Sequence, residues 1–91
     1  MPSYVVSYDQ HRDRDYTPIW NALRQAGAVR VLESVWFLNS TSTAAQVRDW
    51  LKSTTRNEDS LLVLRINQGA DWATYGAQEP GIRWLRQTVA A

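Results

Sequence analysis

The order of the patterned segments constrains the fold of this 91-residue chain more than any other feature. Residues 3–8 are rich in Tyr and Val, side chains that suit a pleated, half-buried surface, so we expect a strand there. A helical pattern follows over residues 17–26. Thr17 is its expected cap, Pro18 suits the first helical position, and Gly27 suits the left-handed geometry that ends a helix.

The next apolar stretch, residues 28–38, is β-rich and contains no Gly or Pro. We interpret it as two short strands in a tight hairpin around Glu33 and Ser34. A single bent strand is the alternative.

A second helix and a last strand complete the pattern. Thr43, with Gln46 three residues later, forms a capping-box signature at the start of a helix. The apolar face expected of that helix consists of Ala44, Val47, Trp50 and Leu51. Residues 61–66 are a nearly continuous apolar run, which predicts a central strand covered on at least one face.

Strand, helix, two strands, helix and strand is the order of a ferredoxin-like α+β fold. We therefore predict one domain over residues 1–91, with a βαββαβ core at about 3–67 and a C-terminal extension at about 68–91. The core is a four-stranded antiparallel sheet with two helices on one face. The other face needs a cover, either a partner subunit or the extension, which has Ile82, Leu85 and Val89 at helical spacing.

Composition excludes several classes of protein. No apolar run approaches the roughly 18 residues that span a bilayer, so we expect no membrane association through a spanning helix. We see no signal peptide at the N-terminus, and there are no cysteines, which fits a cytoplasmic protein. The net charge of +1 does not by itself argue for nucleic acid. Nine of the ten cations are nevertheless Arg, which pairs with phosphates, although a GC-rich genome produces the same bias.

Asp9 is the main candidate functional residue. It ends the first strand, where the sheet fixes the backbone and a carboxylate can hold a metal ion or a reacting group. A carboxylate that caps a turn is the equally weighted alternative.

The charged loop after Asp9 supplies further candidates. His11 could serve as a general base beside carboxylates, but a solvated loop histidine is the more common case. Asp13 and Asp15 alternate with Arg12 and Arg14, so the loop can also neutralise itself. Arg12 and Arg14 are the preferred phosphate contacts; Arg30, Arg48, Arg56 and Arg65 are further ones. Trp36 and Trp50 are expected in the core or at an interface.

Three motifs occur in a familiar order. They are Tyr-Val-Val-Ser-Tyr-Asp at 4–9, Gly-Ala-Val-Arg-Val-Leu-Glu-Ser-Val-Trp-Phe-Leu at 27–38 and Asp-Ser-Leu-Leu-Val-Leu at 59–64. Together they resemble the second of the two universal CRISPR adaptation proteins, here called the Cas-two family. The loop after Tyr8, the Glu-Ser-Val-Trp hairpin and Trp72 are most similar to its stand-alone SinR-like branch. The resemblance covers about residues 3–72.

The resemblance implies a ferredoxin-like homodimer whose sheets face each other, with the two copies of Asp9 meeting near the two-fold axis. In members with nuclease activity this position binds a divalent metal. We therefore expect a nucleic-acid-associated homodimer with endonuclease activity on RNA or DNA, in which paired Asp9 carboxylates hold Mg²⁺ or Mn²⁺. Arg12, Arg14 and Ser34 would contact the nucleic acid. The alternative is a non-catalytic dimeric scaffold that binds another protein in a larger assembly.

Overall fold

The computed structural model describes residues 1–9, 15–55 and 60–89 of the chain. Four strands form one antiparallel sheet in the order β2-β3-β1-β4, which is the ferredoxin-like order, and three helices accompany it. The predicted α+β fold is therefore confirmed. The elements are β1 (Ser3–Tyr8), α1 (Thr17–Gln25), β2 (Val29–Leu32), β3 (Val35–Asn39), α2 (Ala44–Lys52), β4 (Leu61–Ile66) and α3 (Glu79–Thr88).

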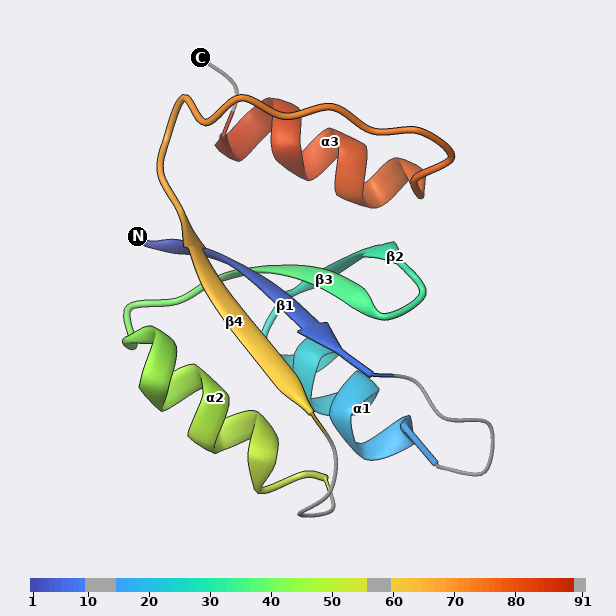
Figure 1. Ribbon diagram of the computed structural model, residues 1–91, viewed down its shortest axis with the longest axis vertical. Helices are drawn as coiled ribbons and strands as arrows, with labels where there is room; N and C mark the ends of the chain where they lie inside the picture. Colours follow the sequence, from blue (N-terminus) through green and yellow to red (C-terminus); the bar gives the residue numbers. More distant parts are fainter. Residues whose placement is uncertain (10–14, 56–59, 90–91) are drawn as a thin grey trace.

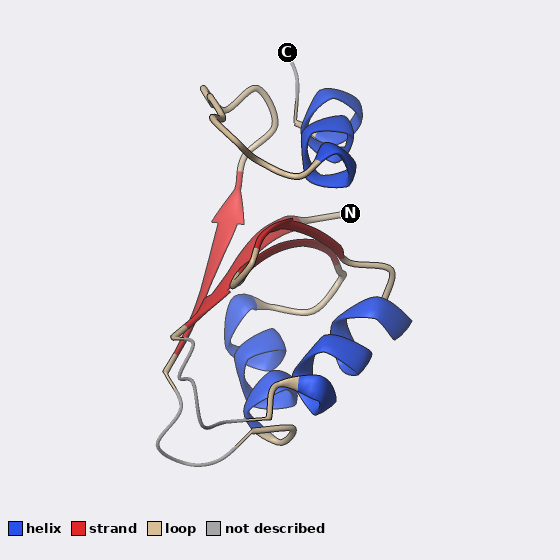
Figure 2. Cartoon of the chain, turned by 90° about the vertical axis from the view of Figure 1, so that its right-hand side faces the viewer, coloured by secondary structure: helices blue, strands red, loops and turns tan. Residues whose placement is uncertain are grey.

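The helices lie on both faces of the sheet. Helices α1 and α2 pack against one face, here called the helical face, and α3 lies on the other, here called the second face (Figure 1). Figure 2 shows the sheet between these two layers. The buried residues accordingly form two clusters. On the helical face, Tyr4, Val6 and Tyr8 of β1 pack with Ile19 of α1 and Leu51 of α2.

The hairpin interpretation of residues 28–38 is confirmed, since β2 and β3 pair through a turn at Glu33 and Ser34. The register shifts between Arg30 and Leu32, so Val31 is an extra residue on its strand. Its C=O, free of the strand ladder, accepts a hydrogen bond from Gln78 N–H at 2.9 Å. This bulge thus connects β2 to the chain that leads into α3.

The two helix starts differ in how well the sequence predicted them. The capping box of α2 is confirmed: Thr43 Oγ1 accepts from Gln46 N–H at 3.1 Å, and Gln46 Oε1 accepts from Thr43 N–H at 2.8 Å. The expectation that Thr17 caps α1 is wrong. The helix begins at Thr17 itself, and the Asp15 carboxylate accepts from Thr17 N–H at 3.0 Å.

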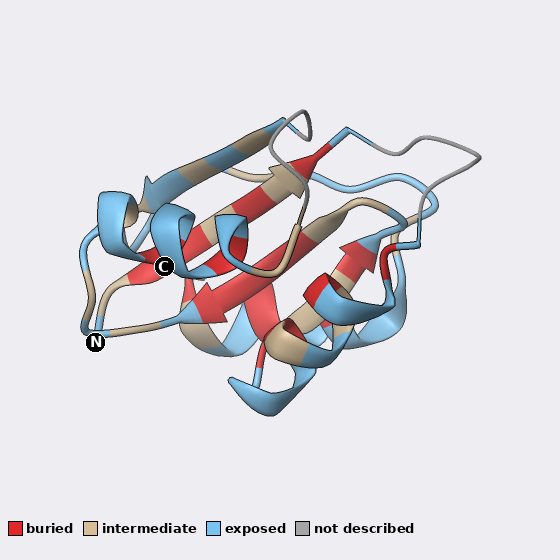
Figure 3. Ribbon diagram, turned by 90° about the horizontal axis from the view of Figure 1, so that it is seen from below, coloured by how far each residue is buried: buried red, intermediate tan, exposed pale blue. Residues whose placement is uncertain are grey.

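Two predictions about apolar positions are corrected. Trp50 does not belong to the buried face of α2; it is 37% exposed, whereas Val47 and Leu51 are buried. Strand β4 is covered on one face, as expected, but it is an edge strand and not a central one. Its even positions Leu62 and Leu64 are each 57% exposed on the second face, and in Figure 3 β4 is the strand without a buried residue. The sequence alone could not distinguish these cases, because both segments are apolar.

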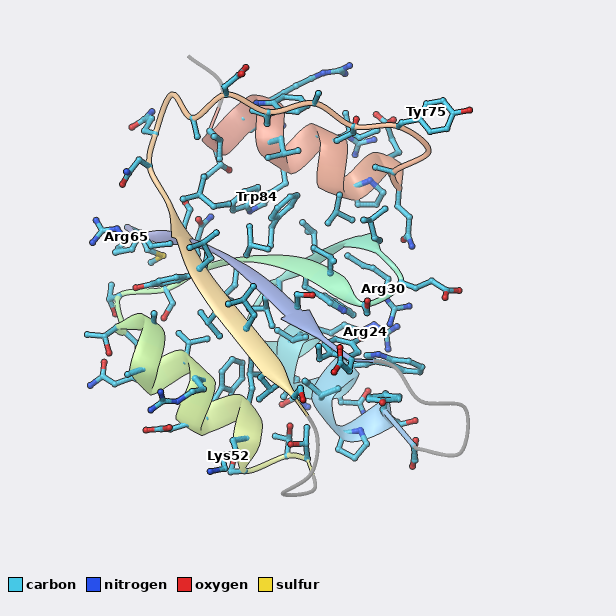
Figure 4. All side chains as sticks on the ribbon, in the orientation of Figure 1. Arg24, Arg30, Lys52, Arg65, Tyr75 and Trp84 are labelled. Atoms are coloured by element: carbon cyan, nitrogen blue, oxygen red, sulfur yellow. The ribbon has the colours of Figure 1, made fainter. Side chains whose placement is uncertain are left out.

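The C-terminal extension covers part of the second face. Trp84 of α3 stacks on Phe37 of β3 with ring centroids 4.6 Å apart, and Leu85 and Val89 are buried in the same cluster. In Figure 4, Trp84 points from α3 towards the sheet. Helix α3 packs mainly over β2, so the β4 side of this face stays uncovered. Within the described part of the chain, no helix has the length and apolarity needed to cross a membrane.

Helix α3 approaches the sheet closely at Gly81. A methyl group added there would lie 2.7 Å from Val31 Cα and closer still to Val31 Cβ, so backbone would have to shift. We expect Gly81→Ala to lower the free energy of unfolding. Overpacking costs about 1–3 kcal/mol, which outweighs the roughly 0.5–1 kcal/mol that Ala gains over Gly in a helix. Urea unfolding measures this loss, and faster amide hydrogen exchange in α3 locates it.

The exposed Gln87 provides the matched control on the same helix. Gln87→Ala should leave both unfolding and exchange unchanged. Equal stability of Gly81→Ala and the wild type would contradict the close packing of α3 on β2.

Candidate functional site

Asp9 lies directly after β1 with its side chain exposed to solvent. Its backbone is held on both sides. Asp9 N–H donates to Ser60 C=O at 3.2 Å, and Asp9 C=O accepts from the Tyr16 hydroxyl at 2.8 Å. The bond to Ser60 continues the β1–β4 ladder, so strand alternation puts Asp9 on the same face as Val5 and Ser7. An accessible carboxylate therefore stands on a fixed backbone at the end of the second face.

Ser34 lies at the same end of the sheet. Its C=O accepts from Tyr8 N–H at 3.2 Å, which continues the β1–β3 ladder into the hairpin turn. Its side chain is half-buried. The structure thus brings two of the predicted site residues, Asp9 and Ser34, to one end of the sheet. Arg12 and Arg14 lie outside the described residues, as do His11, Asp13 and Arg56.

Asp9 has the chemistry of a ligand for a hard divalent cation, because such ions bind carboxylate oxygens. Across residues 1–9, 15–55 and 60–89, no group of three or more His, Cys, Asp or Glu side chains is placed to hold a metal ion. Mg²⁺ nevertheless needs only one or two carboxylates when water fills its other positions. A single exposed Asp9 therefore fits such a site as one carboxylate ligand.

On the helical face, a group of side chains packs next to the Asp9 backbone, and the sequence did not reveal them as a unit. We call Tyr8, Tyr16, Trp20, Arg30 and Trp36 the aromatic cluster. The Tyr8 hydroxyl accepts hydrogen bonds from Trp20 Nε1 at 2.6 Å and Trp36 Nε1 at 3.3 Å, and it donates to Glu33 C=O at 3.2 Å. The sequence placed Trp36 in the core or at an interface, but its meeting with Tyr8 and with α1 depends on tertiary packing.

Arg30 is a cation in the aromatic cluster and not a free phosphate contact. Its guanidinium lies 4.7 Å from the ring centroid of Trp20 and 4.8 Å from that of Trp36. Its Nε and Nη2 atoms are buried without a hydrogen-bond partner. The edge of the Arg30 guanidinium that carries Nε and Nη2 is therefore closed to a phosphate, contrary to the expectation. Figure 4 shows Arg24 near Arg30. The Arg24 guanidinium lies 5.8 Å from the ring centroid of Trp36.

The other described arginines predicted to contact phosphate lie away from Asp9. Arg48 of α2 pairs with its neighbour Asp49 at 3.0 Å. Arg65 is exposed, but it lies opposite Tyr4, towards the other end of β1. In the described part of the chain, neither forms a basic surface around Asp9.

The second face carries an apolar groove beside α3. The groove has a volume of about 360 Å³ and lies between the sheet, at Val35 and Phe37, and the segment before α3, at Trp72 and Tyr75. Tyr75 is fully exposed and points away from the body of the protein (Figure 4). Val5, which lines the groove, pairs with Leu64 of β4. Beside the groove, Ser7, Leu62 and Leu64 form what we call the leucine strip, which leads along β1 and β4 to Asp9.

Asp15 has a structural role at the start of α1. Hydrogen bonds from the Thr17 hydroxyl and then from Thr17 N–H hold the pKa of Asp15 below its ordinary value of 3.8. These bonds favour the charged carboxylate, which also lies at the positive end of the helix dipole. Asp15, directly before the N-cap residue Tyr16, therefore stabilises the first turn of α1 through its side chain.

The hydrogen bonds that Asp15 accepts from Thr17 predict a pH-dependent contribution to stability. Because the pKa is lowered in the folded state, the stabilisation is fully present above the ordinary pKa of 3.8 and is lost as the pH falls through the folded value. We expect Asp15→Ala to lower the melting temperature at pH 7, and the difference from the wild type to shrink as the pH falls below 3.8. Asp15→Asn, which keeps an acceptor without the charge, should show a weaker pH dependence than the wild type. A constant difference between pH 7 and pH 2 would contradict this role.

Comparison with known proteins adds no assignment. No protein-family model matches the chain, and no solved structure matches it.

Proposed function

We propose that the chain works as a Cas-two-like homodimer that associates with nucleic acid and hydrolyses phosphodiester bonds with a divalent metal ion. The observation that carries this proposal is the exposed Asp9 carboxylate on a backbone fixed by both Ser60 and Tyr16. Fixed backbone with an accessible carboxylate is what a metal ligand at a strand end requires. The lack of cysteine fits the reducing cytoplasm, where we propose that the protein acts.

The proposed partner is a second copy, packed across the leucine strip. Helix α3 already covers the β2 side of the second face, so sheet-to-sheet contact is left to the β4 side. Leu62 and Leu64 give that side an apolar surface that a two-fold axis can pair with itself. Asp9 ends this strip, so an axis near the Ser60 end of β4 would bring two Asp9 carboxylates together.

In the proposed reaction two Asp9 carboxylates, one from each protomer, would hold Mg²⁺ or Mn²⁺. A bound divalent cation supplies an activated water and neutralises charge on the phosphate. Ser34, at the same end of the sheet, is proposed to orient the phosphodiester. Arg12 and Arg14, outside the described residues, are proposed to hold the nucleic-acid backbone.

A non-catalytic dimeric scaffold is the second candidate. It is favoured by a specific observation: within the described residues, Asp9 has no cluster of further metal-ligating side chains around it. In this alternative Asp9 is structural and the dimer joins a larger assembly, such as that of a CRISPR system. The leucine strip serves dimerisation in both candidates, so only Asp9 chemistry distinguishes them.

Cleavage assays on labelled single-stranded RNA and duplex DNA distinguish the two candidates. With Mg²⁺ or Mn²⁺, we expect the wild type to cut one of these substrates and Asp9→Asn to be slower by about 100-fold, as when a group that stabilises transition-state charge is removed. The matched control is Asp71→Asn, an exposed carboxylate that follows β4 at the opposite end. It should retain full activity. Absence of cleavage by the wild type, or equal cleavage by Asp9→Asn, would reject the enzyme in favour of the scaffold.

The leucine strip predicts the interface. We expect the wild type to be a dimer of the 10.4 kDa chain and Leu64→Arg to be a monomer. An unpaired charge buried at an interface costs about 3–5 kcal/mol, so dissociation should become at least about 100-fold easier. Analytical ultracentrifugation measures the masses. Asn21→Arg, exposed on α1 of the opposite layer, is the control and should stay dimeric. A monomeric wild type, or a dimeric Leu64→Arg, would rule out this interface.

A further inference from the structure

Tyr16 connects the start of α1 to the end of β1. Its hydroxyl donates to Asp9 C=O at 2.8 Å, and its own C=O accepts from Trp20 N–H at 3.0 Å as the helix begins. Asp9 N–H is held by Ser60 on the other side of the same residue. Both peptide groups next to the Asp9 side chain are therefore fixed, one by the sheet and one by Tyr16.

The ring of Tyr16 is itself held in place. It is buried, and it stacks on Tyr8 with ring centroids 5.3 Å apart and on Trp20 at 6.3 Å. Tyr8 is fixed in turn, because its hydroxyl uses two acceptor positions and one donor position on Trp20, Trp36 and Glu33. The Tyr16 hydroxyl therefore reaches Asp9 from a rigid support.

Arg30 completes this support at a cost. Buried Nε and Nη2 atoms without partners are unfavourable, because each N–H has lost its water. The guanidinium is instead stabilised by the faces of Trp20 and Trp36 at 4.7 and 4.8 Å. This arrangement orients both indole rings, and their N–H groups point at the Tyr8 hydroxyl.

We infer that Tyr16 is a positioning residue for Asp9, and that the aromatic cluster exists in this form to hold it. The Tyr16 hydroxyl holds the Asp9 C=O and so constrains the direction in which the Cα–Cβ bond of Asp9 leaves the backbone. The inference rests on the proposed function, because it matters for activity only if Asp9 binds a metal ion. Residues that orient a metal ligand typically change metal affinity by 10–100-fold when they are altered.

Two Tyr→Phe variants test this role. Tyr16→Phe keeps the stacked ring and removes the hydroxyl that contacts Asp9. Tyr4→Phe is the matched control, because Tyr4 is equally buried and its hydroxyl donates to a backbone carbonyl, Ser42 C=O, at 2.6 Å. Tyr4 lies at the other end of β1 and does not contact Asp9. Both variants should show a similar fall in the urea midpoint, since each loses a buried hydroxyl bond.

The measurement is a Mn²⁺ titration read in two ways, by paramagnetic broadening of the Asp9 amide signal in NMR and by the rate of cleavage. For Tyr16→Phe we expect the half-saturating Mn²⁺ concentration to rise about 10-fold in both readouts, with most of the cleavage rate restored at saturation. For Tyr4→Phe we expect wild-type values.

The outcomes separate the two ideas. If the wild type responds to Mn²⁺ and Tyr16→Phe behaves as Tyr4→Phe does, the positioning role is overturned while the proposed function stands. If the wild type shows neither broadening at Asp9 nor cleavage, the proposed function is overturned and the positioning role with it. A raised Mn²⁺ requirement in Tyr16→Phe alone supports both.

Discussion

Strand β1 is hydrogen-bonded along both edges, to β3 and to β4, and the rest of the molecule depends on this double pairing. Because side chains alternate along a strand, the pairing assigns every β1 residue to one face. Tyr4, Val6 and Tyr8 enter the core under α1 and α2. Val5, Ser7 and the following Asp9 face the other side. The same constraint therefore forms the main core and delivers the candidate site to the end of the second face.

The two faces of the sheet are covered unequally. On the helical face, Val6, Leu23 and Leu51 are completely buried, so α1 and α2 satisfy the core without outside help. On the second face α3 packs over β2 and leaves Leu62 and Leu64 in solvent. Two neighbouring leucines on an edge strand, without a bulge or proline, form the kind of surface that proteins usually pair or cover. This asymmetry is the physical basis for proposing a second copy as the cover.

The aromatic cluster costs free energy of desolvation. It places a charged side chain and several polar groups inside a small domain, and such groups are tolerated only when partners compensate for lost water. Tyr8 is fully compensated, whereas Arg30 is compensated partly by ring faces. A set of aliphatic side chains would fill the same space at less electrostatic cost. The cluster does, however, support Tyr16, and through Tyr16 it reaches Asp9.

Sequence alone determined the features that depend on neighbours along the chain. Side-chain propensity predicted the strands and the hairpin at Glu33 and Ser34. The spacing of Thr43 and Gln46 predicted the capping box, whose hydrogen bonds join residues three positions apart. The strand order followed from the order of elements. Asp9 was found as a candidate because its place at a strand end is also a local property.

Only the tertiary structure decided which apolar residues stay exposed and which polar groups meet. Trp50 and Leu64 are apolar like core residues, yet both are exposed, because no element in the described part of the chain buries them. Arg30 was indistinguishable from a surface arginine until Trp20 and Trp36 met around it. These outcomes depend on contacts between segments far apart in the chain, and the free energy of such contacts is set by packing geometry that no short stretch of sequence contains.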